Sequence, residues 1–313
     1  MTNAKSMATR QAFGEALADL GELHPQIVVL DADLSKSTFS NLFAKRFPER
    51  FLEMGIAEAN MIGTAAGLAL SGFTPFACSF ACFITGRFDQ IKMSVAYSEA
   101  AVCLVGTHAG IGIGPDGYSQ QSLEDIALMR TLPNMRVLQP ADEIEAHQMM
   151  KMLATAQQPS YLRLTRQNLQ LVHEQDYTFR LGVFSQLSAG DDAAIFATGG
   201  TVQHALEASK QLRAAGIAAR VINASSIKPI DEACIIKAAR EVKWLISVED
   251  HSVCGGLGGA IAEVLCAHEP KKLLTLGIKG EFGESGSPEA LYEKHGLDAA
   301  GIFKAVKEWV GAK

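Results

Sequence analysis

Short apolar runs alternate with helix-length segments along the whole chain, and this alternation restricts the fold more than any other feature. The runs 27–30, 101–106 and 193–197 consist almost entirely of apolar residues. Between the runs, apolar residues recur at helical spacing in segments such as 7–23 and 143–156. Strands that alternate with helices form parallel sheets with helices on both faces. We therefore predict an α/β protein.

The alternation occurs in two blocks, separated by a polar, aperiodic stretch. The first block predicts helices over 7–23, 58–71, 83–97, 123–131 and 143–156, a helix that includes 39–43, and strands over 27–30, 73–77, 101–106 and 136–138. The second predicts strands over 193–197, 218–223, 244–248 and 272–277 and helices over 202–215, 231–242 and 258–267. We expect two three-layer α/β/α domains, over 1–166 and 185–313, joined by a linker over 167–184.

The composition indicates an ordinary globular protein. A chain of 313 residues suffices for about two domains, and 48% of its residues are apolar and 20% charged. The net charge of −6 and the pI near 5.8 argue against nucleic acid or an anionic membrane as a partner. The most apolar stretch, 67–83, is too short and too interrupted to span a bilayer. Because the N-terminus lacks the apolar core of a signal peptide, we expect a cytoplasmic location.

The six cysteines do not suggest a metal site. Cys78 and Cys82 form a C-x3-C pair with no second pair nearby, which is poor spacing for zinc. Most of the six lie in apolar surroundings and are predicted to be buried thiols. We therefore assign no metal ligand to this chain.

A single acidic residue, Glu58, opens the small-residue segment that runs on to Phe83. A carboxylate at the start of such a segment is expected to be partly buried, where it can hold or share a proton near neutral pH. An acid of this kind is a candidate for general acid–base catalysis. The alternative is that Glu58 only caps a helix, since acidic residues favour the first turn.

Residues 112–117 satisfy the pattern G-x-G-x-x-G between a predicted strand and a predicted helix, which is the form of a dinucleotide-binding loop. Pro115 has no N–H to offer a pyrophosphate, and Asp116 would place a negative charge beside it. We therefore do not predict a nicotinamide site. The glycines at 255, 256, 258 and 259 are better explained by close packing of a helix on a sheet than by phosphate binding.

Several motifs in one order resemble those of the transketolase family. They are Gly55-Ile56-Ala57-Glu58 with Asn60 and Met61, preceded by Asp31-Ala32-Asp33-Leu34 and followed by His108-Ala109-Gly110 and Asp116-Gly117. The resemblance is to the pyrimidine-binding and C-terminal domains of a transketolase, and it covers essentially the whole chain. It implies that 1–166 is the pyrimidine-binding domain and 185–313 the transketolase C-terminal domain.

The resemblance implies thiamine diphosphate as the cofactor. Glu58 would exchange a proton with the aminopyrimidine ring, and Phe80 and Phe83 fall on positions whose aromatic side chains form the pocket for that ring. Without the resemblance, Phe80 and Phe83 would be interpreted as core residues. Gly86 departs from relatives that often carry a larger side chain there.

The resemblance also implies a sugar-phosphate site built from Arg10, Ser37, His108, Asp116, Gln120 and Arg166. Two arginines and Ser37 would bind the phosphate, since guanidinium groups suit bidentate contact with its oxygens. His108 would lie near the phosphate, and Asp116 and Gln120 would bind sugar hydroxyls. Gln120 stands where many bacterial relatives carry His. Taken singly, the arginines could be solvated, His108 structural and Ser37 a helix cap. Arg163, three residues before Arg166, competes for the phosphate role or could be an exposed strand residue.

The Gly-Asp-Gly motif that binds the metal and diphosphate in this family does not occur in the sequence. We therefore expect Mg²⁺ and the diphosphate to be held by a separate N-terminal transketolase subunit, in a heterotetramer of two subunits of each kind (α2β2). The expected reaction is transfer of a two-carbon ketol unit from a ketose phosphate to an aldose phosphate.

Three alternatives stay open from the sequence. The first two are enzymes of the same architecture: a subunit resembling 1-deoxyxylulose-phosphate synthase, or the β subunit of a 2-oxo acid dehydrogenase. The phosphate-binding set argues against the dehydrogenase, whose substrate carries no phosphate. The third is a partner subunit without catalytic activity, and the presence of Glu58, Phe80 and Phe83 together argues against it.

Overall fold

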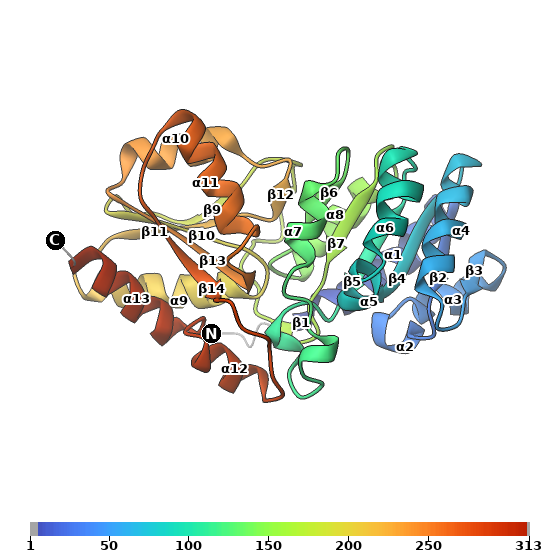
Figure 1. Cartoon of the computed structure of the whole chain (residues 1–313), viewed down its shortest axis with the longest axis horizontal. Coiled ribbons are helices and arrows are strands. Elements are labelled where there is room, and N and C mark those ends of the chain that lie inside the picture. The colour runs from blue at the N-terminus through green and yellow to red at the C-terminus, as the bar shows by residue number, and fades with distance from the viewer. Residues whose placement is uncertain (1–5, 312–313) are drawn as a thin grey trace.

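The computed structural model describes residues 6–311, which form two α/β units lying side by side (Figure 1). Each unit is a mostly parallel sheet covered by helices on both faces. The predicted fold, two three-layer α/β/α units, is confirmed. One hydrophobic core cluster contains residues of both units, so the units share part of their core. No helix within residues 6–311 is long and apolar enough to cross a membrane.

The sheet of the first unit has seven strands. Their order is β12 (Ser226–Lys228), β6 (Arg136–Leu138), β7 (Ser160–Arg163), β5 (Cys103–Thr107), β4 (Thr74–Phe80), β2 (Ile27–Asp31) and β3 (Phe51–Glu53). All strands are parallel except β12, which pairs with β6 in the antiparallel direction. Because parallel strands end at one edge, the carboxyl ends of β2, β4, β5 and β7 bring their following loops together.

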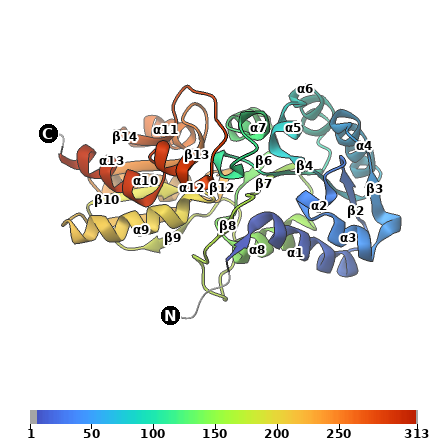
Figure 2. The ribbon, with the colours of Figure 1, turned by 90° about the horizontal axis from the view of Figure 1, so that it is seen from below.

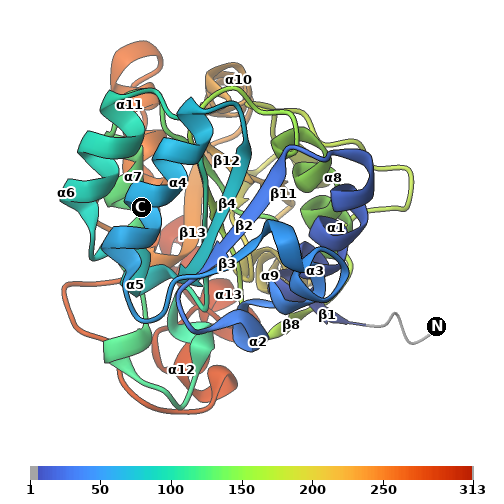
Figure 3. The same ribbon diagram turned by 90° about the vertical axis from the view of Figure 1, so that its right-hand side faces the viewer.

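Helices cover the two faces of this sheet, as Figure 3 shows along its edge. One face carries α1 (Thr9–Leu23), α3 (Asn41–Arg46) and α8 (Glu143–Leu153). The other carries α4 (Glu58–Leu70), α5 (Ala81–Thr85), α6 (Phe88–Gln90), the π-helix η2 (Ile91–Tyr97) and α7 (Asp125–Thr131). Side chains of β2 alternate between these layers: Val29 packs with α1 residues, and Leu30 packs with α4 residues.

The second unit has five strands in the order β14 (Leu273–Ile278), β13 (Trp244–Ser252), β10 (Ala193–Ala197), β11 (Ala219–Asn223) and β9 (Ser185–Ser188). Only β9 is antiparallel to its neighbour. Helices α9 (Thr201–Ala214) and α13 (Ala299–Gly311) cover one face, α10 (Glu232–Glu241) and α11 (Leu257–His268) cover the other, and α12 (Pro288–Lys294) lies towards the first unit (Figure 1).

The structure corrects two helix predictions in the first unit. The predicted helix 83–97 is three pieces, α5, α6 and η2, because the helix stops at Gly86, a residue with poor helix propensity. The predicted helix around 39–43 is divided into α2 (Ser35–Thr38) and α3, because Phe39 adopts a left-handed backbone conformation with φ of 64°. The 3-10 turn η1 (Pro48–Arg50) then leads into β3.

Other elements were not predicted at all. They include β3, β9, β12, α12, α13 and the two-residue strands β1 (Met7–Ala8) and β8 (Asn168–Leu169), which pair with each other. Strands of two or three residues carry too little periodicity to be recognised. In sequence β12 belongs to the second block, yet it completes the sheet of the first, between the two units (Figure 2). The boundaries after residues 166 and 184 stay predictions.

The glycine run of the second unit serves close packing, as predicted. A Cβ on Gly258 would lie 2.7 Å from the Ser247 Oγ atom, and one on Gly256 would lie 1.9 Å from a Glu249 carboxylate oxygen. That carboxylate accepts hydrogen bonds from the backbone N–H groups of Leu257 and Gly258 at the start of α11. The glycines therefore allow α11 to approach the sheet closely, with Glu249 in the place of a bound anion.

Candidate active site

Glu58 is the first residue of α4 and is only 5% exposed. It lines an open groove of about 560 Å³ together with Ile56, Asn60, Gly86 and Arg87. Its position in the first helical turn suits a negative charge near the helix N-terminus. Within residues 6–311, no side chain or backbone group forms a hydrogen bond with its carboxylate. Because the carboxylate lines the groove, it can accept a hydrogen bond from a ligand bound there.

Phe80 and Phe83 lie beside this groove, at the end of β4 and within α5. Their rings are nearly parallel, with an interplanar angle of 8° and centroids 5.7 Å apart. A third ring needs about 3.5 Å of separation on each side, so none fits between them. Phe83 is half-buried, and a planar ligand can stack only on its outer face.

His108 continues the ring stack on the other side. Its imidazole lies on the Phe80 ring with centroids 3.8 Å apart. The residue follows β5 directly and has φ of 60°, so its side chain turns away from the strand direction. The three rings thus link α5, which ends directly before Gly86 of the groove, with the polar cluster around His108.

The hydrogen bonds of His108 define its tautomer. Arg10 Nη1 lies 3.2 Å from Nε2, and a guanidinium can only donate, so Nε2 accepts. The ring proton is then on Nδ1, which donates to Thr107 Oγ1 at 2.9 Å, and Thr107 donates to the carbonyl of Ser79. Burial, together with the charges of Arg10 and Arg166, lowers the pKa of His108 to about 3. The imidazole is therefore neutral at physiological pH.

Arg10 and Ser37 are brought together, but not through the Ser37 hydroxyl. Arg10 Nη1 donates to the backbone carbonyl of Ser37 at 2.5 Å, and the guanidinium lies 5.1 Å from the centre of the Phe39 ring. Ser37 lies inside α2, so the helix-cap interpretation is wrong. The Nε atom of Arg10 is buried without a hydrogen-bond partner. Burial and the nearby charge of Arg166 lower the pKa of Arg10.

Arg166 approaches the same cluster from the segment after β7. It donates to the carbonyl of Ile113 at 2.5 Å, and its guanidinium lies 4.0 Å from the carboxylate of Asp116. Both side chains are half-exposed. The cluster thus contains two positively charged guanidinium groups, a neutral histidine and a single half-exposed carboxylate. Such an excess of positive charge suits an anionic group such as a phosphate.

Gln120 and Arg163 have different surroundings. Gln120 ends the 3-10 turn η4 (Tyr118–Gln120) and is half-buried, and its side chain forms no hydrogen bond within the described part of the chain. Arg163 is 1% exposed and pairs with Asp125 at 2.7 Å. The interpretation of Arg163 as an exposed strand residue is therefore wrong. Its guanidinium is buried and paired within the chain, which argues against a role as a phosphate ligand.

Sequence reasoning missed several residues around the site. Arg87, Asp89 and Gln90 share the groove of Glu58, and Thr107 orients His108. Thr107 could have been found, since it is adjacent to His108 at the end of a predicted strand, whereas the groove residues lie in the helix that was predicted as unbroken. Among residues 6–311, no three His, Cys, Asp or Glu side chains gather as metal ligands would.

The cysteines behave partly as predicted. Cys78 and Cys103 are buried and Cys82 is half-buried beside Phe83, where burial raises the Cys82 pKa to about 12. Cys254 and Cys266 are exposed, so burial was predicted for too many of the six.

Comparison with known proteins identifies the family. Residues 5–172 match the transketolase pyrimidine-binding domain, and residues 182–302 match the transketolase C-terminal domain. The chain belongs to the transketolase family. The resemblance inferred from Glu58 and its neighbouring motifs is thereby confirmed.

Two relatives and one solved structure extend over nearly the whole chain. A protein of Methanocaldococcus jannaschii named as a transketolase C-terminal section is 45% identical, covering 96% of this chain and 95% of the relative. One of the subunits of an apulose-4-phosphate transketolase from Phocaeicola vulgatus is 39% identical, covering 97% and 98%. A structure described as a split-gene transketolase, an inactive β4 tetramer, is 44% identical with a TM-score of 0.89, covering 99% of this chain and all of that one.

Proposed function

We propose that this transketolase-family chain is the C-terminal subunit of a two-chain transketolase. Together with an N-terminal subunit it would transfer a two-carbon ketol unit from a ketose phosphate to an aldose phosphate. The observation that carries the proposal is that one edge of the first sheet holds Glu58, the ring stack of Phe83, Phe80 and His108, and the arginine in contact with His108.

Thiamine diphosphate fits what the chain offers. Within residues 6–311 the Glu58 carboxylate has no hydrogen-bond partner and lines the groove, and the half-buried Phe83 ring lies in α5, which ends directly before Gly86 of that groove. When bound, the cofactor supplies the electron sink for carbon–carbon bond cleavage and formation. Glu58 would hold and exchange a proton with a ring nitrogen of the pyrimidine. Phe83 would orient the ring by stacking.

The positive cluster would bind the substrate. A phosphate between Arg10 and Arg166 would balance two charges that lie unbalanced in the chain alone, and charge-assisted hydrogen bonds to guanidinium groups are strong. Ser37 lies next to Arg10 and would add a contact to the phosphate. His108, neutral and fixed by Thr107, would contact the substrate beside the phosphate. Asp116 and Gln120 would bind the hydroxyls of the sugar.

We place Mg²⁺ and the diphosphate on the partner subunit, because the Gly-Asp-Gly motif that binds them in this family does not occur in the sequence. The face that borders the Glu58 groove carries large exposed apolar side chains, among them Ile56 at 83% and Tyr97 at 80% exposure. Such side chains mark protein interfaces when they cluster. We propose that this face binds the N-terminal transketolase subunit, with two copies of each subunit in the enzyme.

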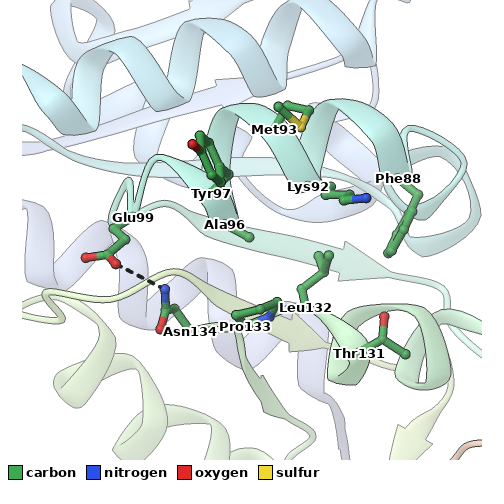
Figure 4. Close-up of a pocket in the computed structure, with 10 residues that line it drawn as sticks. All are labelled: Phe88, Lys92, Met93, Ala96, Tyr97, Glu99, Thr131, Leu132, Pro133 and Asn134. Atoms are coloured by element: carbon green, nitrogen blue, oxygen red, sulfur yellow. Dashed lines mark hydrogen bonds between the residues drawn. The ribbon is translucent and has the colours of Figure 1, made fainter.

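A hollow on the same face supports an interface of this kind. It has a volume of about 550 Å³ and lies between η2 and residues 131–134 (Figure 4). Phe88, Met93 and Tyr97 line it from one side, and Leu132 and Pro133 line it from the other. A hydrogen bond from Asn134 to Glu99 closes one end. Its apolar walls suit side chains of a partner protein.

The test is reconstitution. The chain is co-expressed with the N-terminal transketolase subunit, and transfer from xylulose 5-phosphate to ribose 5-phosphate is measured with thiamine diphosphate and Mg²⁺. We expect activity of the complex and none of either chain alone. Robust ketol transfer by this chain alone would contradict the two-chain assignment. Consumption of pyruvate in place of the ketose would point to one of the alternative enzymes of this architecture.

A further inference from the structure

The loop that carries three of the proposed substrate ligands is unusual in its backbone. This substrate loop, residues 108–120, contains the 3-10 turns η3 (Ile111–Ile113) and η4. His108, Gly110, Gly114 and Gly117 all have positive φ, between 60° and 82°. Near its start the loop donates two backbone hydrogen bonds within its own domain, from Ala109 to the carbonyl of Leu164 and from Gly110 to the carbonyl of Ser122. A chain with so many left-handed residues needs further contacts to keep one conformation.

Asp250, in β13 of the second domain, supplies one of these contacts. Its Oδ1 atom accepts a hydrogen bond from the backbone N–H of Ile111 at 2.8 Å. The side chain fills the space beside Gly110, where an added Cβ would lie 2.2 Å from Oδ2. Asp250 is buried, so this carboxylate replaces water as the partner of the loop backbone.

Tyr292, on α12, holds Asp250 in place. Its hydroxyl donates to Asp250 Oδ2 at 2.7 Å and accepts from Gln167 Nε2 at 3.1 Å. Burial and the neighbouring carboxylate hold the pKa of Tyr292 well above its usual range, so the hydroxyl keeps its proton. Gln167 directly follows Arg166, and its amide packs against Gly112, where a Cβ would lie 2.3 Å away. The Tyr292 hydroxyl thus connects Asp250, which holds the loop, with the neighbour of Arg166.

The segment before α12 contacts the other end of the loop. Gln121 Nε2 donates to the carbonyl of Glu284 at 3.0 Å, and the rings of Tyr118 and Phe282 lie 4.5 Å apart. In Figure 1 this segment, between β14 and α12, runs beside the loop. The second domain therefore contacts both the beginning and the end of the loop.

We infer that Asp250 and Tyr292 are positioning residues for substrate binding. Through them the second domain, which contributes no side chain to the proposed site, fixes the loop that presents His108, Asp116 and Gln120. The assignment of the loop to substrate rests on the proposed function. The contacts that fix the loop do not, and they can be tested separately.

Tyr161 provides a matched control. Like Tyr292 it is fully buried, and its hydroxyl donates to a buried carboxylate, Asp125, at 2.7 Å. It lies in β7 and has no hydrogen bond to the substrate loop. Tyr161→Phe and Tyr292→Phe therefore remove the same group from comparable surroundings. Asp125 keeps its ion pair with Arg163 when the Tyr161 hydroxyl is removed, whereas Asp250 loses the hydroxyl that orients it towards Ile111.

The first measurement is hydrogen–deuterium exchange of the full chain. Tyr292→Phe should speed exchange of the backbone amides in 109–121, because Asp250 loses the hydroxyl that orients it towards Ile111. Tyr161→Phe should leave that segment at the wild-type rate. If Tyr292→Phe does not fold, Asp250→Ala, which removes the acceptor of the Ile111 N–H, tests the same loop. Unchanged exchange in 109–121, or equal changes in both tyrosine variants, would overturn the inference.

The second measurement uses the reconstituted complex. Tyr292→Phe should lower kcat/KM for sugar phosphates by about 10- to 100-fold, mainly through KM, because small displacements of binding groups are costly. Tyr161→Phe should stay near the wild-type value, and a general loss of stability would affect both variants. A fall in kcat alone would contradict a positioning role in binding. If the wild-type complex transfers no ketol unit, the proposed function fails, and the exchange measurement still decides whether Asp250 and Tyr292 hold the loop.

Discussion

Arginine occurs in two buried or half-buried clusters of the first domain, and the two differ in how their charge is balanced. Arg163 is buried, pairs with Asp125, and donates to the carbonyls of Ser122 and Asp250. Burial acts to lower its pKa, but the carboxylates of Asp125 and Asp250 raise it overall. This guanidinium has its partners within the chain, which is typical of a structural ion pair.

Arg10 and Arg166 are the opposite case. Each donates to a single backbone carbonyl, each lies close enough to affect the other, and burial and Arg166 lower the pKa of Arg10. Within residues 6–311, only the half-exposed Asp116 forms an ion pair with either guanidinium. Protein interiors seldom leave guanidinium groups so poorly balanced unless a ligand completes the cluster. An arginine by itself therefore does not identify a ligand-binding site, whereas arginines with few oppositely charged partners in the chain do.

The largest effect is expected at the other end of the site, where Glu58 also lacks a partner. Glu58→Gln keeps the size and the hydrogen-bonding capacity but cannot exchange a proton. Ketol transfer by the reconstituted complex should fall by about 10²–10⁴-fold, the usual worth of general acid–base catalysis. Gel filtration should still show the assembled complex. Glu49→Gln, an exposed acid in η1, serves as the control. A near wild-type rate for Glu58→Gln would return Glu58 to the role of a helix cap.

Replacing Arg163, whose charge is balanced within the chain, should lower the free energy of unfolding and not primarily substrate binding. Arg163→Met leaves Asp125 buried without its cation, and breaking a buried pair costs about 3–5 kcal/mol. Arg166→Met removes a half-exposed, 4.0 Å pair with Asp116 and a hydrogen bond to the Ile113 carbonyl, each worth about 1 kcal/mol. Urea denaturation of the full chain measures both. Equal destabilisation by the two variants would remove the distinction between the clusters.

Substrate binding should be weakened more by replacing Arg166 than by replacing Arg163. Arg166→Ala should raise KM for phosphorylated sugars by roughly 10- to 150-fold, the equivalent of a charge-assisted contact of ~1.5–3 kcal/mol. Unphosphorylated sugars should be nearly unaffected, because they do not use the guanidinium. If both classes of sugar lose affinity equally, the side chain supports structure. If only a folded Arg163 variant shows the phosphate-specific loss, Arg163 is the ligand.

Much of this architecture could be predicted from the sequence, because the alternation of apolar runs and helical segments is local. The runs 27–30 and 193–197 both form strands that pair with a neighbour on each side, β2 and β10. The grouping of Arg10, His108 and Arg166 came from the family resemblance, and it could not come from spacing, since Arg10 and His108 are 98 residues apart. Their unbalanced charge depends on which groups lie close together in three dimensions, and the sequence does not give that.

Other features depend on contacts that no local pattern encodes. The strand β12 has three residues and joins the sheet of the other unit, and Asp250 meets Ile111 across 139 residues. Phe39 leads the chain into a left-handed turn although aromatic residues rarely adopt one. Strand alternation allowed Arg163 to be an exposed strand residue, but the second domain covers that side chain of β7.

The smallest effect concerns a third polar cluster, in the stretch predicted as a linker. His173 Nδ1 lies 3.0 Å from Asp142 Oδ2, and its Nε2 lies 3.1 Å from Ser185 Oγ. Burial acts to lower the pKa of His173, but the hydrogen bond to Asp142 and the charges of Glu145 and Asp142 raise it overall. Burial acts to raise the pKa of Asp142, and His173 lowers it overall. This pair resembles the Arg163 cluster, with charge balanced inside the chain, but its cation titrates.

The sign of the pH dependence follows from these shifts. Because the folded pKa of His173 is raised, its contribution to stability is complete below the unfolded value of about 6.5 and is lost as pH rises through the folded pKa. Because the pKa of Asp142 is lowered, its contribution is present above about 3.9 and is lost as pH falls through the folded pKa. The urea midpoint of wild type, measured from pH 5 to 9, should fall above pH 6.5 relative to His173→Gln. Parallel profiles for the two proteins would mean that His173 stays neutral, and that this cluster, unlike that of Arg163, holds no cation.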